Sequence, residues 1–599
     1  MQFFKENKKE ILSWVLFFIL SASVFYLMES YEHNAFVEVR TMAQFFNIIL
    51  FEFLACIFLC MTGSKKWALR ILFIFSMVFG LVNHYVMEFR STPFVPWDIF
   101  SIRTATSVVG GYHFTFGSRV IIVTLIFIFL FIIVRWMPEQ EKQRSFEEEK
   151  IDKKVEIHKE TAKRWGIRAI CGVILVGSLC GFVTALQNED FQRKNYLYPF
   201  LFTPAHMTKV NGMAVTFSMN LKYIAVDKPD GYRAEEAKEL LDSYETSLTK
   251  EELEALELPN IIVVMDEAFS DLSVLGDFSV SEDPMPFVHS LMEGKENTVS
   301  GSAQVSVCGG NTANSEFEFL TGNTMAFLPN GSIPYQQYIK EEKPSMASYL
   351  KELGYETYGQ HPYNASGWCR DTVYPMLGFS ELSFNTDYIN PTRIRGYISD
   401  ESSFDKIIET FENKKEDQPA FIFNVTMQNH GGYTDEHPGF VSDVVATDFQ
   451  NDALNQYLSL INITDTEFEK LISYFEEVDE KTVVVFFGDH QPSDSVVQPI
   501  MAENGKDVYN LSREDTVLRY QVPYVIWANY DIEEATDVET SLNYLGAQVL
   551  SIAGVPLSPY QNFLLEQSKE KPVVSVMTVP EGLEEYEKLQ YYQLFEYDM

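Results

Sequence analysis

Hydrophobic residues are distributed differently in the two parts of this chain. Before residue 190 they form long runs, each close to the roughly 20 residues that an α-helix needs to cross a bilayer. Five such runs are expected to span a membrane: Ile11–Met28, Phe45–Thr62, Leu69–Phe89, Val120–Trp136 and Ile167–Leu186. The pattern therefore predicts an α-helical membrane domain with five spans over residues 1–187.

Lysine and arginine are concentrated in alternate loops of this domain. They precede the first span as Lys5, Lys8 and Lys9, and they are dense between the fourth and fifth spans, over residues 142–164. Positively charged loops of membrane proteins stay in the cytoplasm. We therefore expect a cytoplasmic N-terminus, and an odd number of spans then places everything after Gln187 outside the cell.

From Pro259 onward, short apolar runs alternate with segments of helical periodicity. Strands are expected at Asn260–Met265, 355–358, Ala420–Val425, Thr482–Phe487 and Pro523–Trp527, and helices at Ser345–Leu353, Thr464–Glu477 and Leu542–Ala553. The helix at Thr464 is predicted from a capping-box pattern, because Glu467 follows three residues later. This alternation predicts an α/β domain over residues 258–599, with a mainly parallel central sheet and helices on both faces.

Residues 188–257 connect the two domains. Their aromatic residues indicate a segment along the membrane interface, and residues 234–256 have the spacing of one or two surface helices. The net charge of −38 argues against nucleic acid as a partner. Of the six cysteines, only Cys308 and Cys369 lie in the predicted α/β domain, where one disulfide or two free thiols are both possible.

Chemically active side chains follow the predicted strands. Glu267 comes directly after one strand, Asp489 and His490 after another, and His430 follows a third. In parallel sheets, sites form beyond the carboxyl ends of the strands. Two carboxylates and an imidazole are suitable ligands for a divalent cation, so the sequence predicts a metal site at this edge.

Thr312 is the candidate nucleophile. It follows Gly309 and Gly310, whose backbone lets a ligand approach closely, and it is placed at the start of a helix as the N-cap. A helix N-terminus favours anions, including a phosphorylated threonine. Threonine also caps helices without any catalytic role, and spacing alone supports both interpretations equally.

Three motifs resemble those of lipoteichoic acid synthases. They are Glu267, the segment Gly310–Phe317 and the triplet Gly488-Asp489-His490. These synthases are five-span membrane proteins of Gram-positive bacteria with an extracellular sulfatase-like domain of the alkaline phosphatase superfamily. The resemblance implies that Glu267, Thr312, Asp489 and His490 bind a divalent metal, manganese in this family, with Thr312 as the nucleophile.

The resemblance also implies a substrate site and a reaction. His361, Trp368, Arg370 and His430 would hold the phosphoglycerol headgroup. The reaction would transfer glycerol phosphate from phosphatidylglycerol, through a covalent intermediate on the threonine, to a growing polyglycerolphosphate or glycolipid acceptor in lipoteichoic acid synthesis or a related pathway of the cell envelope.

The chain departs from the best-known synthases at several positions. Asn311 and Asn314 stand where those enzymes have Lys and Asp, and Gln491-Pro492 replaces Tyr-Gly. The headgroup and acceptor therefore stay open, with a phosphoethanolamine transferase or a phosphodiesterase-type or sulfatase-like hydrolase as alternatives. A sulfatase itself is disfavoured, because Cys308 lacks the following Pro-x-Arg. A non-enzymatic sensor is the remaining alternative.

Overall fold

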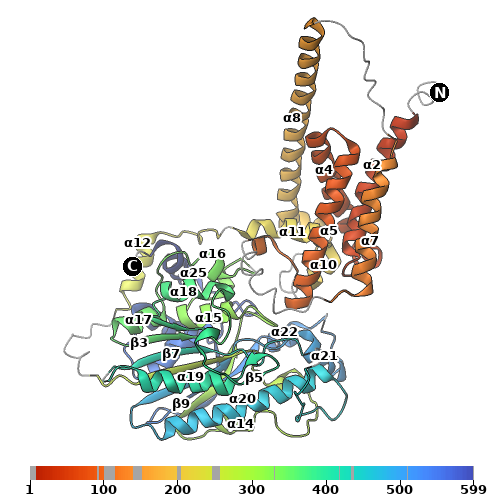
Figure 1. The fold of residues 1–599 in the computed structure, drawn as a ribbon. Coiled ribbons are helices and arrows are strands. Elements are labelled where there is room, and N and C mark those ends of the chain that lie inside the picture. Colours follow the sequence, from red (N-terminus) through yellow and green to blue (C-terminus); the bar gives the residue numbers. More distant parts are fainter. Residues whose placement is uncertain are drawn as a thin grey trace. The chain divides into compact units, whose positions relative to one another are not determined.

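The computed structural model describes residues 8–90, 93–99, 115–138, 151–198, 204–224, 226–245, 256–329, 331–416, 418–433, 437–508 and 510–597. Apart from a short stretch that begins at Ile99 and is grouped with the second unit, the chain divides into two compact units at the boundary between Ile224 and Ala225 (Figure 1). The segment expected to be a linker is thus shared between them, since residues up to 224 belong to the helical unit and later ones to the α/β unit.

The first unit is a bundle of long apolar helices. Five are long and apolar enough to cross a membrane, over Lys8–Glu29, Thr41–Thr62, Lys65–Glu88, Ser118–Trp136 and Ala162–Gln187, which confirms the five long apolar helices that the sequence predicts. Large apolar side chains such as those of Ile19, Phe45 and Val173 remain exposed on the bundle surface. Exposed apolar surface of this kind suits contact with lipid. The long helices are α2 (Lys8–Glu29), α4 (Thr41–Thr62), α5 (Lys65–Arg90), α7 (Ser118–Ile133) and α8 (Ile151–Gln187).

Short helices complete this unit. The backbone N–H of Met213, at the start of α11, donates to the buried carboxylate of Glu29 at 2.7 Å, and that of Val215 donates to Asn47 at 3.1 Å. These bonds satisfy helix-terminal donors inside the bundle. The short helices are α3 (Ala35–Glu38), η1 (Pro96–Ile99), η3 (Val134–Trp136), α9 (Glu189–Lys194), α10 (Pro204–Asn211), α11 (Met213–Asn220) and η4 (Leu221–Ile224).

An eight-stranded sheet forms the centre of the second unit. The order is β10-β2-β9-β8-β1-β7-β3-β4, and only β9 runs antiparallel to its neighbours. The mainly parallel sheet is therefore confirmed. The strands are β1 (Asn260–Asp266), β2 (Thr298–Gln304), β3 (Glu356–Gln360), β4 (Glu381–Ser383), β7 (Ala420–Val425), β8 (Thr482–Gly488), β9 (Gln521–Ala528) and β10 (Ala535–Ser541), beside a small hairpin of β5 (Arg393–Ile394) and β6 (Tyr397–Ile398).

Two hydrophobic cores lie on opposite faces of this sheet. Successive side chains of a strand point to opposite faces, so Ile261 and Val263 of β1 enter one core while Ile262 and Val264 enter the other. The first core is covered by α15, α17 and α23, and the second by α14, α19, α20 and α21 (Figure 1). Burial on both faces explains why the central strands read as continuous apolar runs.

The helices of this unit begin and end mostly where the periodicity predicts. The helix predicted to begin at Thr464 is an exception: α20 begins at Asp452 with Asn451 as its N-cap, so Thr464 lies inside the helix. The main helices are α12 (Ala234–Asp242), α14 (Pro286–Met292), α15 (Thr312–Thr321), α16 (Pro334–Gln337), α17 (Met346–Glu352), α18 (Arg370–Met376), α19 (Asp400–Asn413), α20 (Asp452–Glu476), α21 (Asp494–Glu503), α22 (Arg513–Leu518), α23 (Leu542–Ile552), α24 (Pro559–Glu570) and α25 (Glu584–Tyr591), followed by the π-helix η9 (Tyr592–Glu596).

A small third core joins the start of this unit to its end. Ala237 and Leu241 of α12 pack with Phe563 of α24 and Tyr586 of α25. This confirms one surface helix in the segment after residue 234. The rest of the predicted helical segment, residues 246–255, lies outside the described residues.

Candidate metal centre and active site

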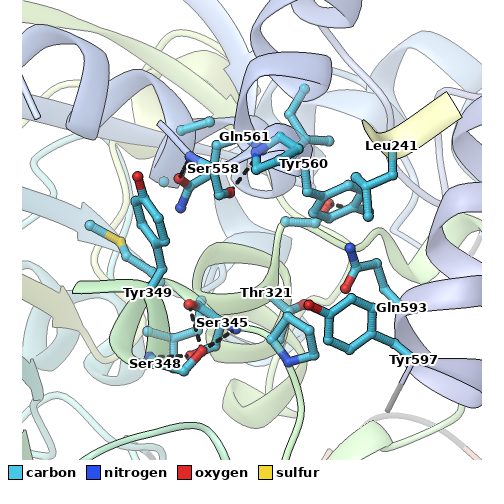
Figure 2. Close-up of a pocket in the computed structure, with 18 of the residues that line it drawn as sticks. Leu241, Thr321, Ser345, Ser348, Tyr349, Ser558, Tyr560, Gln561, Gln593 and Tyr597 are labelled. Carbon is cyan, nitrogen blue, oxygen red and sulfur yellow. Dashed lines mark hydrogen bonds between the residues drawn. The ribbon is translucent and has the colours of Figure 1, made fainter. Parts of the chain in front are cut away.

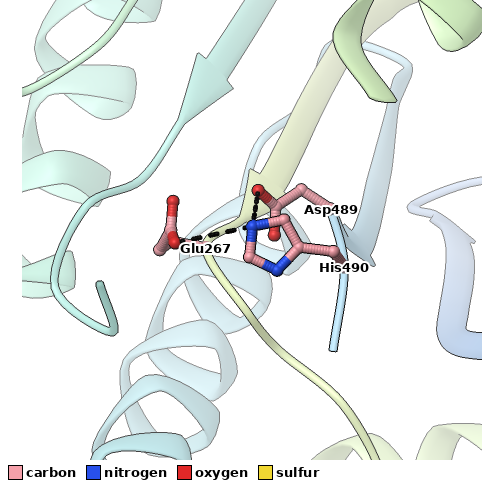
Figure 3. Close-up of side chains that lie close together, drawn as sticks. All are labelled: Glu267, Asp489 and His490. Atoms are coloured by element: carbon pink, nitrogen blue, oxygen red, sulfur yellow. Dashed lines mark ion pairs between the residues drawn. The ribbon is translucent and has the colours of Figure 1, made fainter. Parts of the chain in front are cut away.

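Strand register brings the predicted metal ligands together. β1 and β8 are parallel neighbours, and Asp266 is paired with Gly488 in their ladder. The next residues along the two strands are Glu267 and Asp489, so both carboxylates emerge side by side at the carboxyl edge of the sheet. His490 follows directly, and the three side chains point toward one another (Figure 3).

The three side chains have the spacing of a metal site. One ligand atom from each of Glu267, Asp489 and His490 lies within 4.8 Å of the others. Nε2 of His490 is 3.2 Å from Oδ2 of Asp489 and 3.8 Å from Oε1 of Glu267. The hydroxyl of Thr312 donates to Oε2 of Glu267 at 3.4 Å. All four residues predicted to hold the metal thus meet in one buried place.

Two buried atoms of this cluster make no hydrogen bond, and this suits a cation. Oδ2 of Asp489 and Nε2 of His490 are buried, and neither has a hydrogen-bond partner among the described residues. Burial, followed by the charge of Asp489, raises the pKa of Glu267 well above its usual value, and burial also raises the pKa of Asp489. A divalent cation would relieve both costs, because buried carboxylates are stable when they coordinate metals.

Hydrogen bonds around the cluster fix its geometry. Nδ1 of His490 lies 2.9 Å from the carbonyl of Gln491, which turns Nε2 toward the carboxylates. The N–H of Ala268 donates to Oδ1 of Asp489 at 2.7 Å, and Ser315 donates to the Asp489 carbonyl at 2.6 Å. Thr426 accepts from the N–H of Glu267 at 3.0 Å. Sequence reasoning missed Ser315 and Thr426, since isolated hydroxyl residues carry no distinctive pattern.

Helix α15 begins one residue earlier than predicted. The N-cap is Asn311, which has a left-handed backbone and makes no side-chain capping bond, while Thr312 is the first helical residue. The assignment of Thr312 as the N-cap was therefore wrong. Because its hydroxyl does not cap the helix, it is directed to Glu267 instead.

Left-handed backbone conformations accumulate around the site. Ala268 follows Glu267 with φ 56°, Asn311 precedes Thr312 with φ 69°, and Trp368 and Cys369 have φ 55° and 61°. Such conformations cost non-glycine residues of the order of 1–3 kcal/mol each and are concentrated at functional sites. This observation supports a functional role for the loop that precedes Arg370.

Arg370 is held by a buried ion pair. Its Nε lies 3.0 and 3.2 Å from the two carboxylate oxygens of Glu316, its Nη2 also donates to Glu316, and Tyr374 donates to the same carboxylate at 2.8 Å. Arg370 is 2% exposed and Glu316 is fully buried. Glu316 lies one helical turn after Thr312, so α15 positions both the hydroxyl and the guanidinium.

The two predicted substrate histidines are neutral at physiological pH. Burial, then the charge of Arg370, lowers the pKa of His361 well below its ordinary value, and its Nδ1 lies 3.0 Å from the Val425 carbonyl. Burial, then His490 and Arg395, lowers the pKa of His430 to about 4. Nδ1 of His430 lies 3.1 Å from the hydroxyl of Tyr397.

The remaining predicted residues lie in the loop between β3 and α18. Trp368 is half-buried and packs against the first hydrophobic core. Neither Cys308 nor Cys369 forms a disulfide, which decides the open choice between a disulfide and two thiols.

The fold and the cluster can be set beside known proteins. A mainly parallel sheet carries a cluster of possible metal ligands at its carboxyl edge, beside a hydroxyl at the start of a helix. Residues 259–555 match the Sulfatase family model. This part of the chain therefore resembles sulfatases, and its α/β fold with a mainly parallel sheet is the predicted one.

This chain spans about half the length of the curated relatives that it matches. A Rhizobium meliloti (strain 1021) protein assigned to cyclic beta-1,2-glucan modification is 31% identical over 380 residues, 61% of this chain and 56% of the relative. The capsular polysaccharide biosynthesis protein RkpI of the same organism is 28% identical over 238 residues, 39% of this chain and 42% of the relative.

Solved structures include similar domains. The phosphoglycerol transferase GacH of Streptococcus pyogenes, in complex with sn-glycerol-1-phosphate, has 23% identity and a TM-score of 0.49, over 62% of this chain and 95% of that chain. The lipoteichoic acid synthase LtaP of Listeria monocytogenes has 20% identity and a TM-score of 0.41, over 53% of this chain and 78% of that chain.

Proposed function

We propose that this protein is a membrane-anchored, metal-dependent phosphoglycerol transferase. It would move glycerol phosphate from phosphatidylglycerol to a polymer or glycolipid of the cell envelope. The observation that carries the proposal is the Thr312 hydroxyl, directed at the start of a helix to a buried cluster of two carboxylates and an imidazole. The sulfatase-like fold and the resemblance to lipoteichoic acid synthases support it.

The reaction would proceed by two displacements. Oγ1 of Thr312 attacks the phosphorus of the lipid, the bond from phosphorus to the diacylglycerol oxygen breaks, and the threonine proton ends on the released diacylglycerol. A hydroxyl of the acceptor then attacks the glycerophosphoryl-threonine, and its proton returns to Thr312. Covalent catalysis of this type divides one difficult transfer into two easier ones.

The cluster would hold one divalent cation, for which manganese is the candidate. Glu267, Asp489 and His490 would supply oxygen and nitrogen ligands, and Thr312 would complete the set. When bound, such a cation supplies Lewis-acid stabilisation of negative charge on phosphoryl oxygens and a lowered pKa for attached hydroxyl groups.

The surrounding residues would hold the headgroup. Nε and Nη2 of Arg370 are engaged by Glu316, so Nη1 would donate to the phosphate. His361 and His430 are neutral and would hydrogen-bond the headgroup without competing with the cation for negative charge. Trp368 would pack against the glycerol carbons.

The membrane unit would place this site beside its lipid substrate. Five apolar helices with a cytoplasmic N-terminus would put the sulfatase-like domain outside the cell. Anchoring raises the effective concentration of a lipid at the site. The names of the two Rhizobium relatives, which concern envelope glycans, support an acceptor in the cell envelope.

The decisive experiment is a headgroup-capture assay. Full-length protein in vesicles of mixed phosphatidylglycerol and phosphatidylethanolamine is incubated with Mn²⁺, and the peptide containing Thr312 is analysed by mass spectrometry. We expect a glycerophosphoryl adduct and release of diacylglycerol, both absent in Thr312→Ala. A phosphoethanolamine adduct would replace the donor assignment, and adduct-free protein with no lipid product would refute the transferase.

A further inference from the structure

A cavity lies in the α/β unit at the end of α15 that is far from the metal centre. It measures about 390 Å³ and is bordered by the end of α15, the start of α17, the start of α24 and the C-terminal segment, with α12 at its rim (Figure 2). This volume lies within the range of small-molecule sites in proteins. Its lining includes Leu241, Thr321, Tyr349, Tyr560 and Gln593.

The cavity is separate from the metal centre. Thr312 is the first residue of α15, whereas Thr321 and Gly322 at its other end line the cavity. At 1.5 Å per residue, the two ends of this helix are about 14 Å apart. The headgroup residues His361, Arg370 and His430 are absent from the lining. The cavity would therefore bind something other than the reacting phosphate.

A buried amide in the cavity lacks a partner. Gln593 is 4% exposed, and its Oε1 accepts no hydrogen bond among the described residues. Figure 2 shows that Gln593 and Tyr597 project from the C-terminal segment toward the middle of the pocket. A buried acceptor without a hydrogen bond destabilises the protein, so a ligand that brings a hydroxyl donor would gain affinity by donating to it.

The charges around the cavity oppose an anionic ligand. Asp242, Glu245 and Glu352 line it, against the single cation Lys238. Burial, followed by Glu352, raises the pKa of Tyr597, so its hydroxyl stays protonated as a donor. The C-terminal end of α15 adds a partial negative charge from its carbonyl groups. A polyanionic glycerolphosphate chain is thus a poor fit.

We propose that this cavity binds a neutral saccharide. The tyrosine rings offer apolar faces to the C–H groups of a sugar, while Gln593, Tyr597 and the rim carboxylates offer partners to its hydroxyls. Together these features match a ligand that is uncharged, partly apolar and rich in donors. The inference does not rest on the reaction at the metal centre, and the variants below separate the two.

The test is saturation-transfer NMR on full-length, Mn²⁺-loaded protein in detergent. The probes are two neutral disaccharides, sophorose and cellobiose, with sn-glycerol 3-phosphate and tetramethylammonium as anionic and cationic comparisons. We expect saturable binding of at least one disaccharide in the cavity and no binding of tetramethylammonium there. sn-Glycerol 3-phosphate is expected to bind at the metal centre instead, so the cavity variants should leave its binding unchanged. Gln593→Met, which keeps the volume and removes the amide, should weaken disaccharide binding about 3–10-fold, the cost of a lost hydrogen bond.

One further variant inside the cavity and two variants outside it serve as controls. Tyr597→Phe should also weaken binding and serves if Gln593→Met is poorly folded by its melting temperature. Gln567→Met on α24, outside the lining, and Thr312→Ala should bind disaccharide like the wild type. Absence of saturable disaccharide binding, wild-type disaccharide affinity in both cavity variants, or binding of a charged probe that the cavity variants weaken more than they weaken disaccharide binding would overturn the proposal.

Discussion

Replacing Glu316 with glutamine tests how the site is held together. The substitution keeps the shape of the side chain but removes its charge, and it leaves the guanidinium of Arg370 buried without a counter-ion. Three contacts to Arg370 and the 2.8 Å bond from Tyr374 converge on this carboxylate. Breaking a buried ion pair by removing one partner costs about 3–5 kcal/mol.

The effect should appear in both stability and turnover. Thermal unfolding of the full-length protein in detergent, followed by intrinsic fluorescence, should show a clearly lower melting temperature for Glu316→Gln. Turnover should also fall, because Arg370 loses the contact that orients it, although Glu316 itself need not touch the substrate. The matched control is Glu236→Gln, which breaks an exposed Arg–Glu pair with Arg233 and should leave both properties unchanged.

A double variant separates the buried charge from other effects. Glu316→Leu combined with Arg370→Met replaces the pair by apolar side chains, and replacing a buried ion pair in this way is often neutral or stabilising. We expect the double variant to be more stable than Glu316→Gln. It should nevertheless be inactive, because it lacks the guanidinium of Arg370. If Glu316→Gln melts with the wild type, or if the double variant is no more stable than the single one, the reasoning about this pair is refuted.

Three further predictions concern the metal, the nucleophile and a distant ion pair. Thr312→Ala should retain the fold and Mn²⁺ binding but lose diacylglycerol release; retained release would exclude Thr312 as nucleophile. Chelation should lower the melting temperature of the wild type and restored Mn²⁺ should raise it, whereas Asp489→Asn should respond weakly to both, and equal responses would contradict the ligand assignment. His289 has its pKa raised from 6.5 to about 9 by Asp271 and Asp283, so its contribution to stability is complete below pH 6.5 and is lost as the pH rises through 9. The melting-temperature difference between wild type and His289→Gln should therefore shrink over that interval, and a constant difference would contradict the linkage.

The strands and the metal ligands could be predicted because their signals are local. Runs such as Thr482–Phe487 are apolar and β-branched or aromatic, and a buried parallel strand needs little more than this. Glu267 and Asp489 each follow such a run, and the parallel arrangement brings strand ends together. The register between β1 and β8 then places the two carboxylates side by side, because the residues directly before them, Asp266 and Gly488, are paired.

Two helix starts were predicted wrongly, because a threonine at a possible N-cap position does not always begin a helix there. Thr464 and Glu467 have capping-box spacing, but the apolar stripe of α20 already begins at Ala453, so the helix continues through them. The Thr464 hydroxyl instead donates to Asp400 and accepts from Asn429. Thr312 was misplaced by one residue, because the left-handed Asn311 occupies the N-cap without a capping bond.

Contacts between distant residues could not be read from the chain, and they decide how the site works. Glu316 lies 54 positions before Arg370 and looks in sequence like an ordinary acidic residue of a helix. In the structure it shares one face of α15 with Thr312, one turn away. A single rigid helix therefore sets the position of the hydroxyl, which points to Glu267, and of the guanidinium, through Glu316. Any shift of α15 along its axis would move the hydroxyl and the carboxylate that holds Arg370 together, so this helix couples the position of the proposed nucleophile to that of the proposed phosphate-binding group.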